Sequence, residues 1–193
     1  MSSGLQSRYG SWAVVTGASA GIGRALAVEL ASGGLNVVLV ARREDRLTAL
    51  SSQLASAHGV SCRVVALDLI AADAIDRLTS ATADLDVGLV AHAAGVGVGG
   101  PHFDARVERH HRMLALNCGA ALDLLSAYLP AMKARGRGGF VLFGSVVGFT
   151  GVPWAAHYSA TKAWIHSLGE ALQVELRGTG VDVSVVAPGP TTS

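Results

Sequence analysis

Short apolar runs and helical patterns alternate along almost the whole chain, and few folds can accommodate this alternation. The apolar runs have the length of strands and are nearly continuous, as expected for strands that are covered on both faces. Strict alternation of strands and helices predicts an α/β fold with a Rossmann-like, doubly wound parallel sheet. We expect six strands, at residues 12–16, 36–40, 63–67, 87–92, 140–143 and 182–186. We expect helices at residues 21–32, 43–57, 71–83, 104–134 and 154–177.

The composition supports one folded domain and excludes several other classes of protein. Of the 193 residues, 50% are hydrophobic and 15% are charged, which allows a sizeable core and excludes a disordered chain. Lys and Arg total 15 against 14 Asp and Glu, so the chain lacks the basic excess that binding to nucleic acid requires. We predict an N-terminal tail at residues 1–11, a single folded domain at residues 12–193, and no nucleic-acid partner.

One long segment, at residues 138–161, contains no Asp, Glu, Lys or Arg and could be mistaken for a membrane span. Its glycines and Pro153 would break a helix, so we expect a buried strand, a loop and a helix start there, and no membrane partner. The first residues contain no apolar core of signal-peptide length. Cys62 and Cys118 lie outside any CxxC pattern. Together these features predict a cytoplasmic protein with reduced thiols.

The glycine-rich segment TGASAGIG at residues 16–23 follows the first expected strand and opens the first helix. Gly17 permits a tight turn, Gly21 lets the backbone approach a pyrophosphate, and Gly23 allows close contact between helix and strand. The helix N-terminus would offer free N–H groups to an anion. An ordinary tight turn is the alternative, and a P-loop is excluded because no Gly-Lys-Ser/Thr follows. We predict dinucleotide binding by Gly17, Ser19, Ala20, Gly21, Ile22 and Gly23.

The end of the second expected strand should distinguish NADP from NAD. An acidic residue there would bind the ribose 2′-hydroxyl, whereas an arginine accommodates a 2′-phosphate. The sequence reads Arg42-Arg43 and reaches no carboxylate before Glu44. The alternative is that both arginines are solvated residues at a helix start, but cations there oppose the helix dipole. We therefore predict that Arg42 and Arg43 bind NADP in preference to NAD.

Tyr158 and Lys162 begin the last long helix at a spacing of four residues, which places both side chains on one helix face. The chain has only two lysines against thirteen arginines, so a lysine at this position is informative. A cation close to a phenol lowers the pKa of the phenol from about 10 and assists proton transfer near neutral pH. The alternative for this pair alone is an ordinary helical contact with a packed ring.

Together these segments resemble the short-chain dehydrogenase/reductase family, in its compact branch with TGxxxGxG and Tyr-x-x-x-Lys motifs. The resemblance covers residues 12–193 and implies hydride transfer between the nicotinamide of NADP(H) and a small-molecule carbonyl or secondary alcohol. It implies that Tyr158 exchanges the substrate proton, Ser145 hydrogen-bonds the reacting oxygen, Lys162 tunes Tyr158 and binds the ribose, and Asn117 holds a relay water. It also implies cofactor contacts by Asp68, Leu69, Ala93, Ala94, Gly95, Tyr158, Lys162, Pro188 and Gly189.

The chain departs from the family pattern in two places. The family usually has Asn-Asn-Ala-Gly after the fourth strand, and this chain has His92-Ala93-Ala94-Gly95. The small residues that allow close approach to the cofactor are kept, but we expect the side-chain hydrogen bonds of the asparagines to be lost. Family members also continue past the Pro-Gly turn, so we expect the seventh strand and the substrate lid to be absent. The resemblance further implies a homodimer or homotetramer that pairs through the two long helices.

Other readings of the sequence can be compared with this one. A serine hydrolase would need Gly-x-Ser-x-Gly, but Phe143 and Val147 occupy the glycine positions around Ser145. The histidines show no HExxH spacing, so no metal is predicted. Trp154 and Trp164 flank Tyr158, and either core packing or substrate contact is possible for them. The serious rival is a sensor or structural protein that binds the dinucleotide without turnover; the complete Asn–Ser–Tyr–Lys set favours the enzyme.

Overall fold

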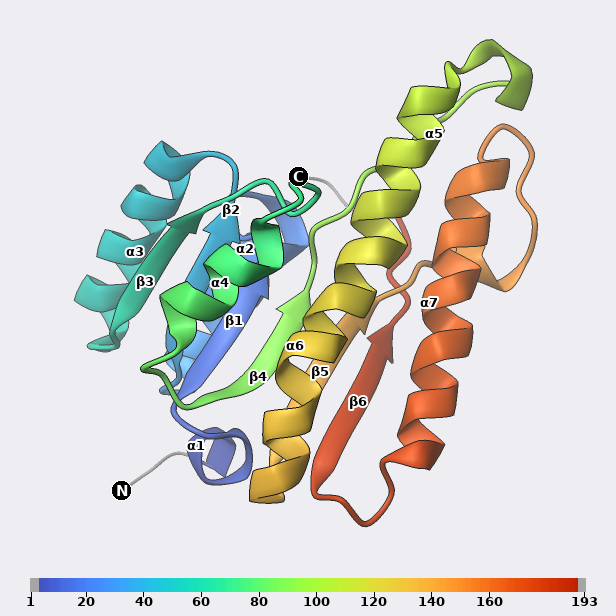
Figure 1. Cartoon of the computed structure of the whole chain (residues 1–193). Helices are drawn as coiled ribbons and strands as arrows, with labels where there is room; N and C mark the ends of the chain where they lie inside the picture. Colours follow the sequence, from blue (N-terminus) through green and yellow to red (C-terminus); the bar gives the residue numbers. More distant parts are fainter. Residues whose placement is uncertain (1–3, 191–193) are drawn as a thin grey trace.

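A six-stranded parallel sheet lies at the centre of the computed structural model, which describes residues 4–190 (Figure 1). The strand order is β3-β2-β1-β4-β5-β6, so the order reverses between β1 and β4. Sheets of this type bind ligands at such a reversal, beyond the carboxyl ends of the strands. The predicted Rossmann-like fold with six strands is confirmed. The strands are β1 (Trp12–Thr16), β2 (Asn36–Ala41), β3 (Cys62–Ala66), β4 (Val87–His92), β5 (Gly138–Phe143) and β6 (Val181–Val186).

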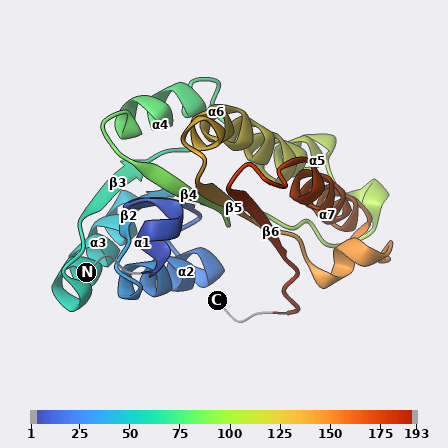
Figure 2. The same ribbon diagram turned by 90° about the horizontal axis from the view of Figure 1, so that it is seen from below.

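Helices cover both faces of the sheet. In the view from below, α2 and α3 lie on one face, and α4, α6 and α7 lie on the other (Figure 2). Two 3-10 turns, His102–Asp104 and Val146–Phe149, and a π turn, Ala115–Gly119, complete the described elements. The α-helices are α1 (Gly4–Tyr9), α2 (Gly21–Ser32), α3 (Glu44–His58), α4 (Ala74–Thr82), α5 (Val107–Leu114), α6 (Ala120–Arg135) and α7 (Ala156–Glu175).

The central strands β1, β2 and β4 are largely apolar and buried because each of their faces contributes to a separate core. Along β1, Val14 packs into the core beneath α4, α6 and α7, whereas Ala13 and Val15 pack into the core beneath α2 and α3. All six residues of β4 are buried. With the middle of the sheet closed to water in this way, the polar groups available for chemistry collect where the strands end.

The structure corrects three of the expected elements. The helix expected at residues 104–134 is divided into α5, the π turn and α6, and residues 105–106 lie outside any helix. The helix expected to begin at residue 71 begins at Ala74, because the Ala71 N–H turns back to the carbonyl of Asp68 at 3.0 Å. The expected tail contains α1, whose Tyr9 hydroxyl donates to the carboxylate of Asp182 on β6 at 3.1 Å. The tail and the domain predicted at residues 12–193 both extend beyond the described residues.

Two apolar segments have a composition that suggests membrane spans, and both contribute elements to the folded domain. Residues 138–161 form β5, a 3-10 turn and the start of α7, as predicted. By length and composition, the continuous helical segment Val107–Arg135 could cross a membrane. The core helix of a folded domain passes the same test, and in this segment 44% of the apolar window is buried inside the molecule. Its α6 part packs against β4 and β5.

Candidate active site

A cleft of about 500 Å³ opens at the carboxyl ends of β1 to β4. It brings together every cofactor-binding residue predicted from these strand ends, whereas Tyr158, Lys162, Pro188 and Gly189 are not part of its lining. The predicted residues in the lining are Gly17, Ser19, Ala20, Gly21, Ile22, Gly23, Arg42, Arg43, Asp68, Leu69, Ala93, Ala94 and Gly95. Sequence reasoning missed the lining residues Val40, Ala41, Leu67, Val96, Arg112 and Leu116.

The floor of the cleft is backbone, because the glycine turn packs directly on its neighbours. Gly17 has a φ of +70°, and a Cβ there would lie 2.8 Å from the backbone nitrogen of Ala94. A Cβ on Gly23 would overlap the carbonyl oxygen of Gly17. The N-cap of α2 is Ala20, whose side chain cannot cap the helix, so the first N–H groups of α2 remain available for an anion. This cradle fits the pyrophosphate of a dinucleotide.

Arginines occupy two edges of the same cleft. Arg43 is the N-cap of α3, and its guanidinium donates to the Ser19 hydroxyl at 2.9 Å, which ties the end of β2 to the glycine turn. Across the cleft, the Arg112 guanidinium forms an ion pair with Asp68 at 3.0 Å. Asp68 carries the only carboxylate among the described residues that line the cleft. Two guanidinium groups at the end of β2 suit a ribose phosphate better than a ribose hydroxyl.

Asn117 lies in the π turn and is almost completely buried. Its Oδ1 accepts a hydrogen bond from the Val96 N–H at 3.0 Å, and its Nδ2 donates to the Val96 carbonyl at 3.0 Å and to the Thr161 hydroxyl at 3.1 Å. The amide therefore joins the loop after β4 to the π turn and to α7. A Cβ on Gly95 would lie 3.2 Å from Oδ1 of Asn117 and 3.7 Å from Nζ of Lys162, so the cleft ends beside these two side chains.

Tyr158 and Lys162 occupy successive turns of α7, which begins at Ala156. Nζ of Lys162 lies 5.7 Å from the centre of the Tyr158 ring, consistent with the shared helix face that the spacing predicts. The ammonium group donates to the Phe143 carbonyl at the end of β5, at 2.7 Å. Burial lowers the pKa of Lys162 to about 8, because a buried ammonium is poorly solvated. Lys162 therefore carries its charge at neutral pH and loses it in mild alkali.

Ser145 follows β5 and is the N-cap of the 3-10 turn Val146–Phe149. Its hydroxyl lies 3.4 Å from the Pro188 carbonyl, to which it donates, and 3.4 Å from the Val147 N–H, from which it accepts. The Val146 N–H also donates to the Pro188 carbonyl, at 3.1 Å. The loop after β6, which contains Pro188 and Gly189, is thus attached directly to the Ser145 turn.

The buried imidazole of His92 supplies hydrogen bonds that were expected to be absent from its segment. Nε2 lies 3.1 Å from the Leu116 carbonyl, and Nδ1 lies 3.0 Å from the Thr16 hydroxyl. A carbonyl can only accept, so Nε2 carries the hydrogen and Nδ1 accepts from Thr16, whose oxygen in turn accepts the Ala94 N–H at 3.1 Å. Burial lowers the pKa of His92 to about 4. The imidazole thus forms side-chain hydrogen bonds of its own at residue 92, whereas Ala93 has no side chain that could form one, and a neutral imidazole fixes the end of β4.

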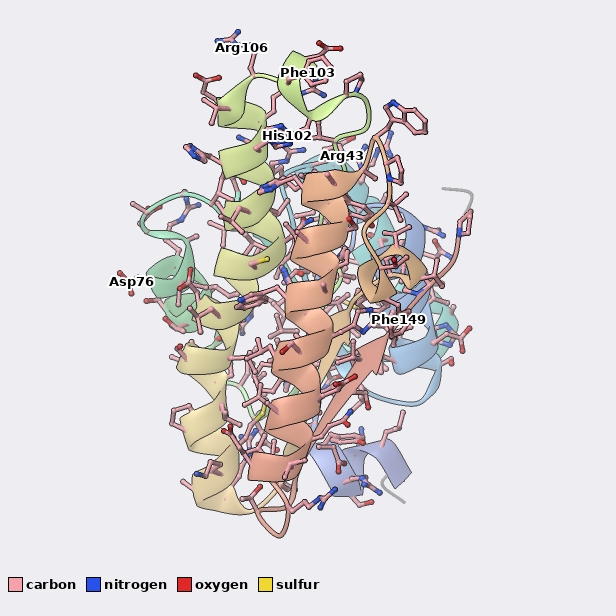
Figure 3. All side chains as sticks on the ribbon, turned by 90° about the vertical axis from the view of Figure 1, so that its right-hand side faces the viewer. Arg43, Asp76, His102, Phe103, Arg106 and Phe149 are labelled. Carbon is pink, nitrogen blue, oxygen red and sulfur yellow. The ribbon has the colours of Figure 1, made fainter. Side chains whose placement is uncertain are left out.

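Trp154 resolves one of the alternatives that the sequence left open. Its indole is 69% exposed, so it does not pack in the core. Among the described residues it is the one non-glycine with positive φ, at 60°, a backbone conformation that costs free energy. Its carbonyl accepts the Gly100 N–H at 2.8 Å, which holds the loop over residues 97–100 close to Tyr158. Phe103, in the 3-10 turn His102–Asp104, is also largely exposed (Figure 3).

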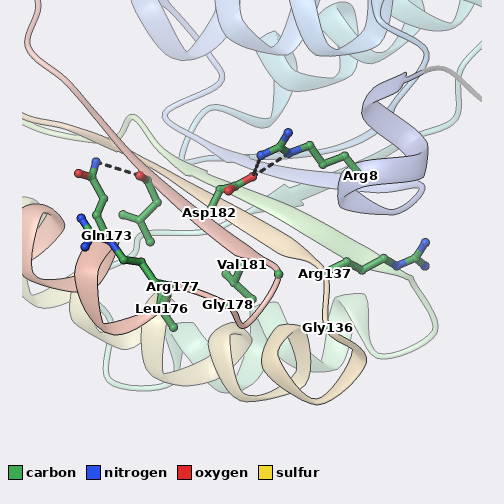
Figure 4. A pocket seen from close by; sticks show the side chains of 11 residues that line it. Arg8, Gly136, Arg137, Gln173, Leu176, Arg177, Gly178, Val181 and Asp182 are labelled. Carbon is green, nitrogen blue, oxygen red and sulfur yellow. Dashed lines mark hydrogen bonds and ion pairs between the residues drawn. The ribbon is translucent and has the colours of Figure 1, made fainter.

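A second cleft, of about 600 Å³, lies beside the start of β6 (Figure 4). Two of the three arginines in its lining are engaged in ion pairs: Arg8 lies 2.7 Å from Asp182, and Arg137 lies 2.8 Å from Asp86. The cleft is at the amino end of the sheet and has no residue in common with the site described above. Within residues 4–190, no group of three or more His, Cys, Asp or Glu side chains could hold a metal ion.

A doubly wound sheet with a glycine-lined cleft where its strand order reverses defines an α/β protein of the dinucleotide-binding class. The short chain dehydrogenase family model matches residues 11–193. A 7beta-hydroxysteroid dehydrogenase of Collinsella aerofaciens is 35% identical, and the alignment covers 97% of this chain and 71% of that protein. The chain therefore belongs to the short-chain dehydrogenase/reductase family of oxidoreductases, whose members bind nicotinamide cofactors.

Solved structures support the same assignment. A structure described as giving insights into 7beta-hydroxysteroid dehydrogenase stereoselectivity has a TM-score of 0.93 at 34% identity and covers 97% of this chain and 73% of that chain. A short-chain dehydrogenase from Sphingobium yanoikuyae in complex with NADPH has a TM-score of 0.90 at 33% identity. That comparison covers 94% of this chain and 71% of the other.

Proposed function

We propose that this protein is an NADP(H)-dependent oxidoreductase that interconverts a ketone and a secondary alcohol. One observation carries the proposal: the buried ammonium of Lys162 lies beside the Tyr158 ring, where the glycine-lined cleft ends at Gly95. A non-catalytic dinucleotide sensor would not need such a pair. The similarity to 7beta-hydroxysteroid dehydrogenases supports a bulky, largely apolar alcohol or ketone as the substrate. The exposed Trp154 indole near Tyr158 would suit such a molecule.

The residues of the cleft account for the parts of the cofactor in turn. The N-terminus of α2 and its glycine turn would hold the pyrophosphate, and Arg42 and Arg43 would hold the phosphate on the ribose. When bound, the nicotinamide ring supplies or accepts the hydride. The remaining proposed contacts are Asp68 and Leu69 at the adenosine end, Ala93, Ala94 and Gly95 along the middle, and Pro188 and Gly189 at the nicotinamide end.

The four side chains predicted to be catalytic would handle the proton and the charge on the reacting oxygen. In reduction, the Tyr158 hydroxyl gives its proton to the substrate carbonyl oxygen; in oxidation it takes the proton back. The charged Lys162 lowers the free energy of the phenolate that remains, and the Ser145 hydroxyl donates to the reacting oxygen. Both amide hydrogens of Asn117 are already donated, so a relay water would donate to the remaining lone pair of its Oδ1.

Tyr158→Phe tests the proposed function, with turnover followed by NADPH absorbance on a panel of steroid ketones, other bulky ketones, 3-oxoacyl thioesters and aldehydes. We expect this variant to lose turnover and to bind NADPH as the wild type does. Tyr9→Phe is the matched control, because Tyr9 lies on α1, near the N-terminus and distant in sequence from Tyr158; this variant should retain full activity. Loss of both turnover and NADPH binding in Tyr158→Phe would indicate a folding role. Tight binding of NADPH by the wild type without oxidation across the panel would favour the sensor.

We further propose that the chain forms a homodimer or homotetramer through α5–α6 and α7. Leu114, Leu122 and Val174 on these helices are about half exposed, which supports an apolar contact between copies. Sedimentation of the purified protein would test this. Cys62 and Cys118 are free thiols, in keeping with the cytoplasmic location that we propose.

A further inference from the structure

We propose that His166 is a positioning residue that fixes the Ser145 turn against the helix carrying Tyr158 and Lys162. The inference rests on the proposed function, because His166 would act through the hydroxyl of Ser145. On α7, His166 follows Lys162 by four residues and Tyr158 by eight, so the three side chains form one stripe along the helix. The stripe brings three polar side chains to the end of β5, and the proposed mechanism uses only two of them.

Both the carbonyl oxygen and the backbone nitrogen of Ser145 contact the His166 imidazole. Nε2 of His166 lies 3.0 Å from the Ser145 carbonyl oxygen and 3.4 Å from the Ser145 backbone nitrogen. A carbonyl oxygen only accepts, so the shorter contact is a hydrogen bond donated by Nε2. The imidazole is 8% exposed, and a buried hydrogen bond of this kind holds its partners in one geometry more firmly than an exposed one.

The rest of the turn leaves room for this ring. A Cβ on Gly144 would lie 2.5 Å from Cε1 of His166, and a Cβ on Gly148 would lie 2.7 Å from Cδ2, so a larger residue at either position would collide with the imidazole. The Phe149 ring stacks on the imidazole with centroids 4.3 Å apart and an angle of 26° between the planes. Phe149 is itself 68% exposed (Figure 3), and its ring covers one face of the imidazole. Residues 144–149 therefore pack closely against the His166 ring, and the two glycines leave the space that the ring occupies.

The hydroxyl of Ser145 depends on this anchor because its own contacts are long. Both hydrogen bonds of Oγ, to the Pro188 carbonyl and from the Val147 N–H, measure 3.4 Å. Such bonds orient a hydroxyl only weakly, so the backbone of Ser145 sets the position of Oγ. Nζ of Lys162 donates to the Phe143 carbonyl at 2.7 Å, and Nε2 of His166 donates to the carbonyl of Ser145, two residues further along the chain. One helix thereby determines where the serine hydroxyl lies relative to the Tyr158 phenol.

Two substitutions of His166 distinguish a role in positioning Ser145 from a role in packing alone. His166→Leu removes the donor, whereas His166→Gln keeps an N–H group close to the position of Nε2. We expect His166→Leu to lower kcat by ~10-fold to ~100-fold, the scale on which small misplacements of a reacting group act. The dissociation constant for NADPH should stay unchanged, and His166→Gln should recover most of the loss in kcat. His58→Leu, at an exposed histidine at the end of α3, is the matched control and should leave kcat unchanged.

A double-mutant cycle shows whether His166 acts through Ser145. In a Ser145→Ala background, His166→Leu should have almost no further effect on kcat, because the hydroxyl that it positions is already absent. An equal loss in both backgrounds, or no loss in the wild-type background, would overturn the proposal. If His166→Leu does not fold, His166→Gln is compared with His166→Asn, whose shorter amide does not reach the Ser145 carbonyl; equal kcat values would again overturn it. Full turnover in Tyr158→Phe would instead refute the proposed function itself.

Discussion

Acid should destabilise this protein through His92, and the magnitude follows from the burial of its imidazole. The pKa of His92 is lowered from 6.5 to about 4 in the folded state, where desolvation opposes the charged form. Between these two values the unfolded chain binds a proton that the folded chain does not, so stability is lost as the pH falls from 6.5 toward 4. The full loss is about 3 kcal/mol, and about 2 kcal/mol of it has occurred by pH 5. The free energy of unfolding of a natural protein is only about 5–15 kcal/mol in total, so this loss is a substantial part of it.

His92→Asn removes the titrating group, and its effect can be measured by urea unfolding followed by tryptophan fluorescence. The stability advantage of the wild type over this variant should fall by about 2 kcal/mol between pH 7.5 and pH 5. Both proteins contain the same carboxylates, so the effect of carboxylate titration on stability cancels when the two proteins are compared. His58→Asn, at an exposed histidine on α3, is the control, and its difference from the wild type should stay constant with pH.

A constant difference between the wild type and His92→Asn across this pH range would refute the reasoning. It would mean that the folded and unfolded states release the His92 proton at the same pH, and that the imidazole is not held neutral between Thr16 and Leu116. Titration of the imidazole carbon-bound protons by NMR gives an independent reading. A midpoint near 6.5 in the folded protein would contradict the same argument.

Three further outcomes follow from contacts in the cleft. Arg43→Ala, which removes a guanidinium next to the Ser19 hydroxyl, should raise the KM for NADPH by ~10-fold or more and leave that for NADH nearly unchanged; steady-state kinetics with both cofactors checks this. The rate of ketone reduction should fall as the pH rises through about 8, because Lys162 loses the charge that stabilises the Tyr158 phenolate; a pH–rate profile measures it. Asn117→Ala should lower the free energy of unfolding by about 2 kcal/mol in urea denaturation, because it leaves buried groups of Val96 and Thr161 without their partner.

Most of the fold could be predicted because strand and helix signals are local. A strand such as β2 is apolar on both faces, and its ends lie within a residue or two of the apolar run. The π turn was not predictable in the same way, since one extra residue in a long apolar helix barely changes its periodicity. Nor was α1, a polar segment whose position depends on contacts of Arg8 and Tyr9 with Asp182, more than 170 residues away in the sequence.

In the candidate site, too, features that depend on a local motif could be predicted, whereas contacts between distant residues could not. Much of the cleft lining could be predicted because every strand–helix turn of a parallel sheet that follows a strand lies at the same edge of the sheet, so a short motif after a strand has a known place in the fold. The partners of Asp68 and Ser145 could not be predicted in this way. The sequence shows that Arg112 and His166 are polar residues on helices, but not which carboxylate or main-chain carbonyl each one faces. For His166 one signal was available, the continuation of the Tyr158–Lys162 spacing by four more residues.

Buried and partly buried hydrogen bonds join the glycine-lined cleft to the helix that carries Tyr158 and Lys162. His92 ties β1 to the π turn, and Asn117 ties the π turn to the loop after β4 and to α7. Lys162 and His166 then tie α7 to the end of β5. Unsatisfied polar groups are costly in a protein interior, so each link favours one geometry, whereas apolar contacts tolerate small displacements. The hydride transfer that we propose would need the cleft and the Tyr158–Lys162 pair in one fixed geometry, and an apolar core alone would not supply it. A histidine in place of asparagine at residue 92 can therefore be accommodated, because the imidazole still spans from the Thr16 hydroxyl to the Leu116 carbonyl.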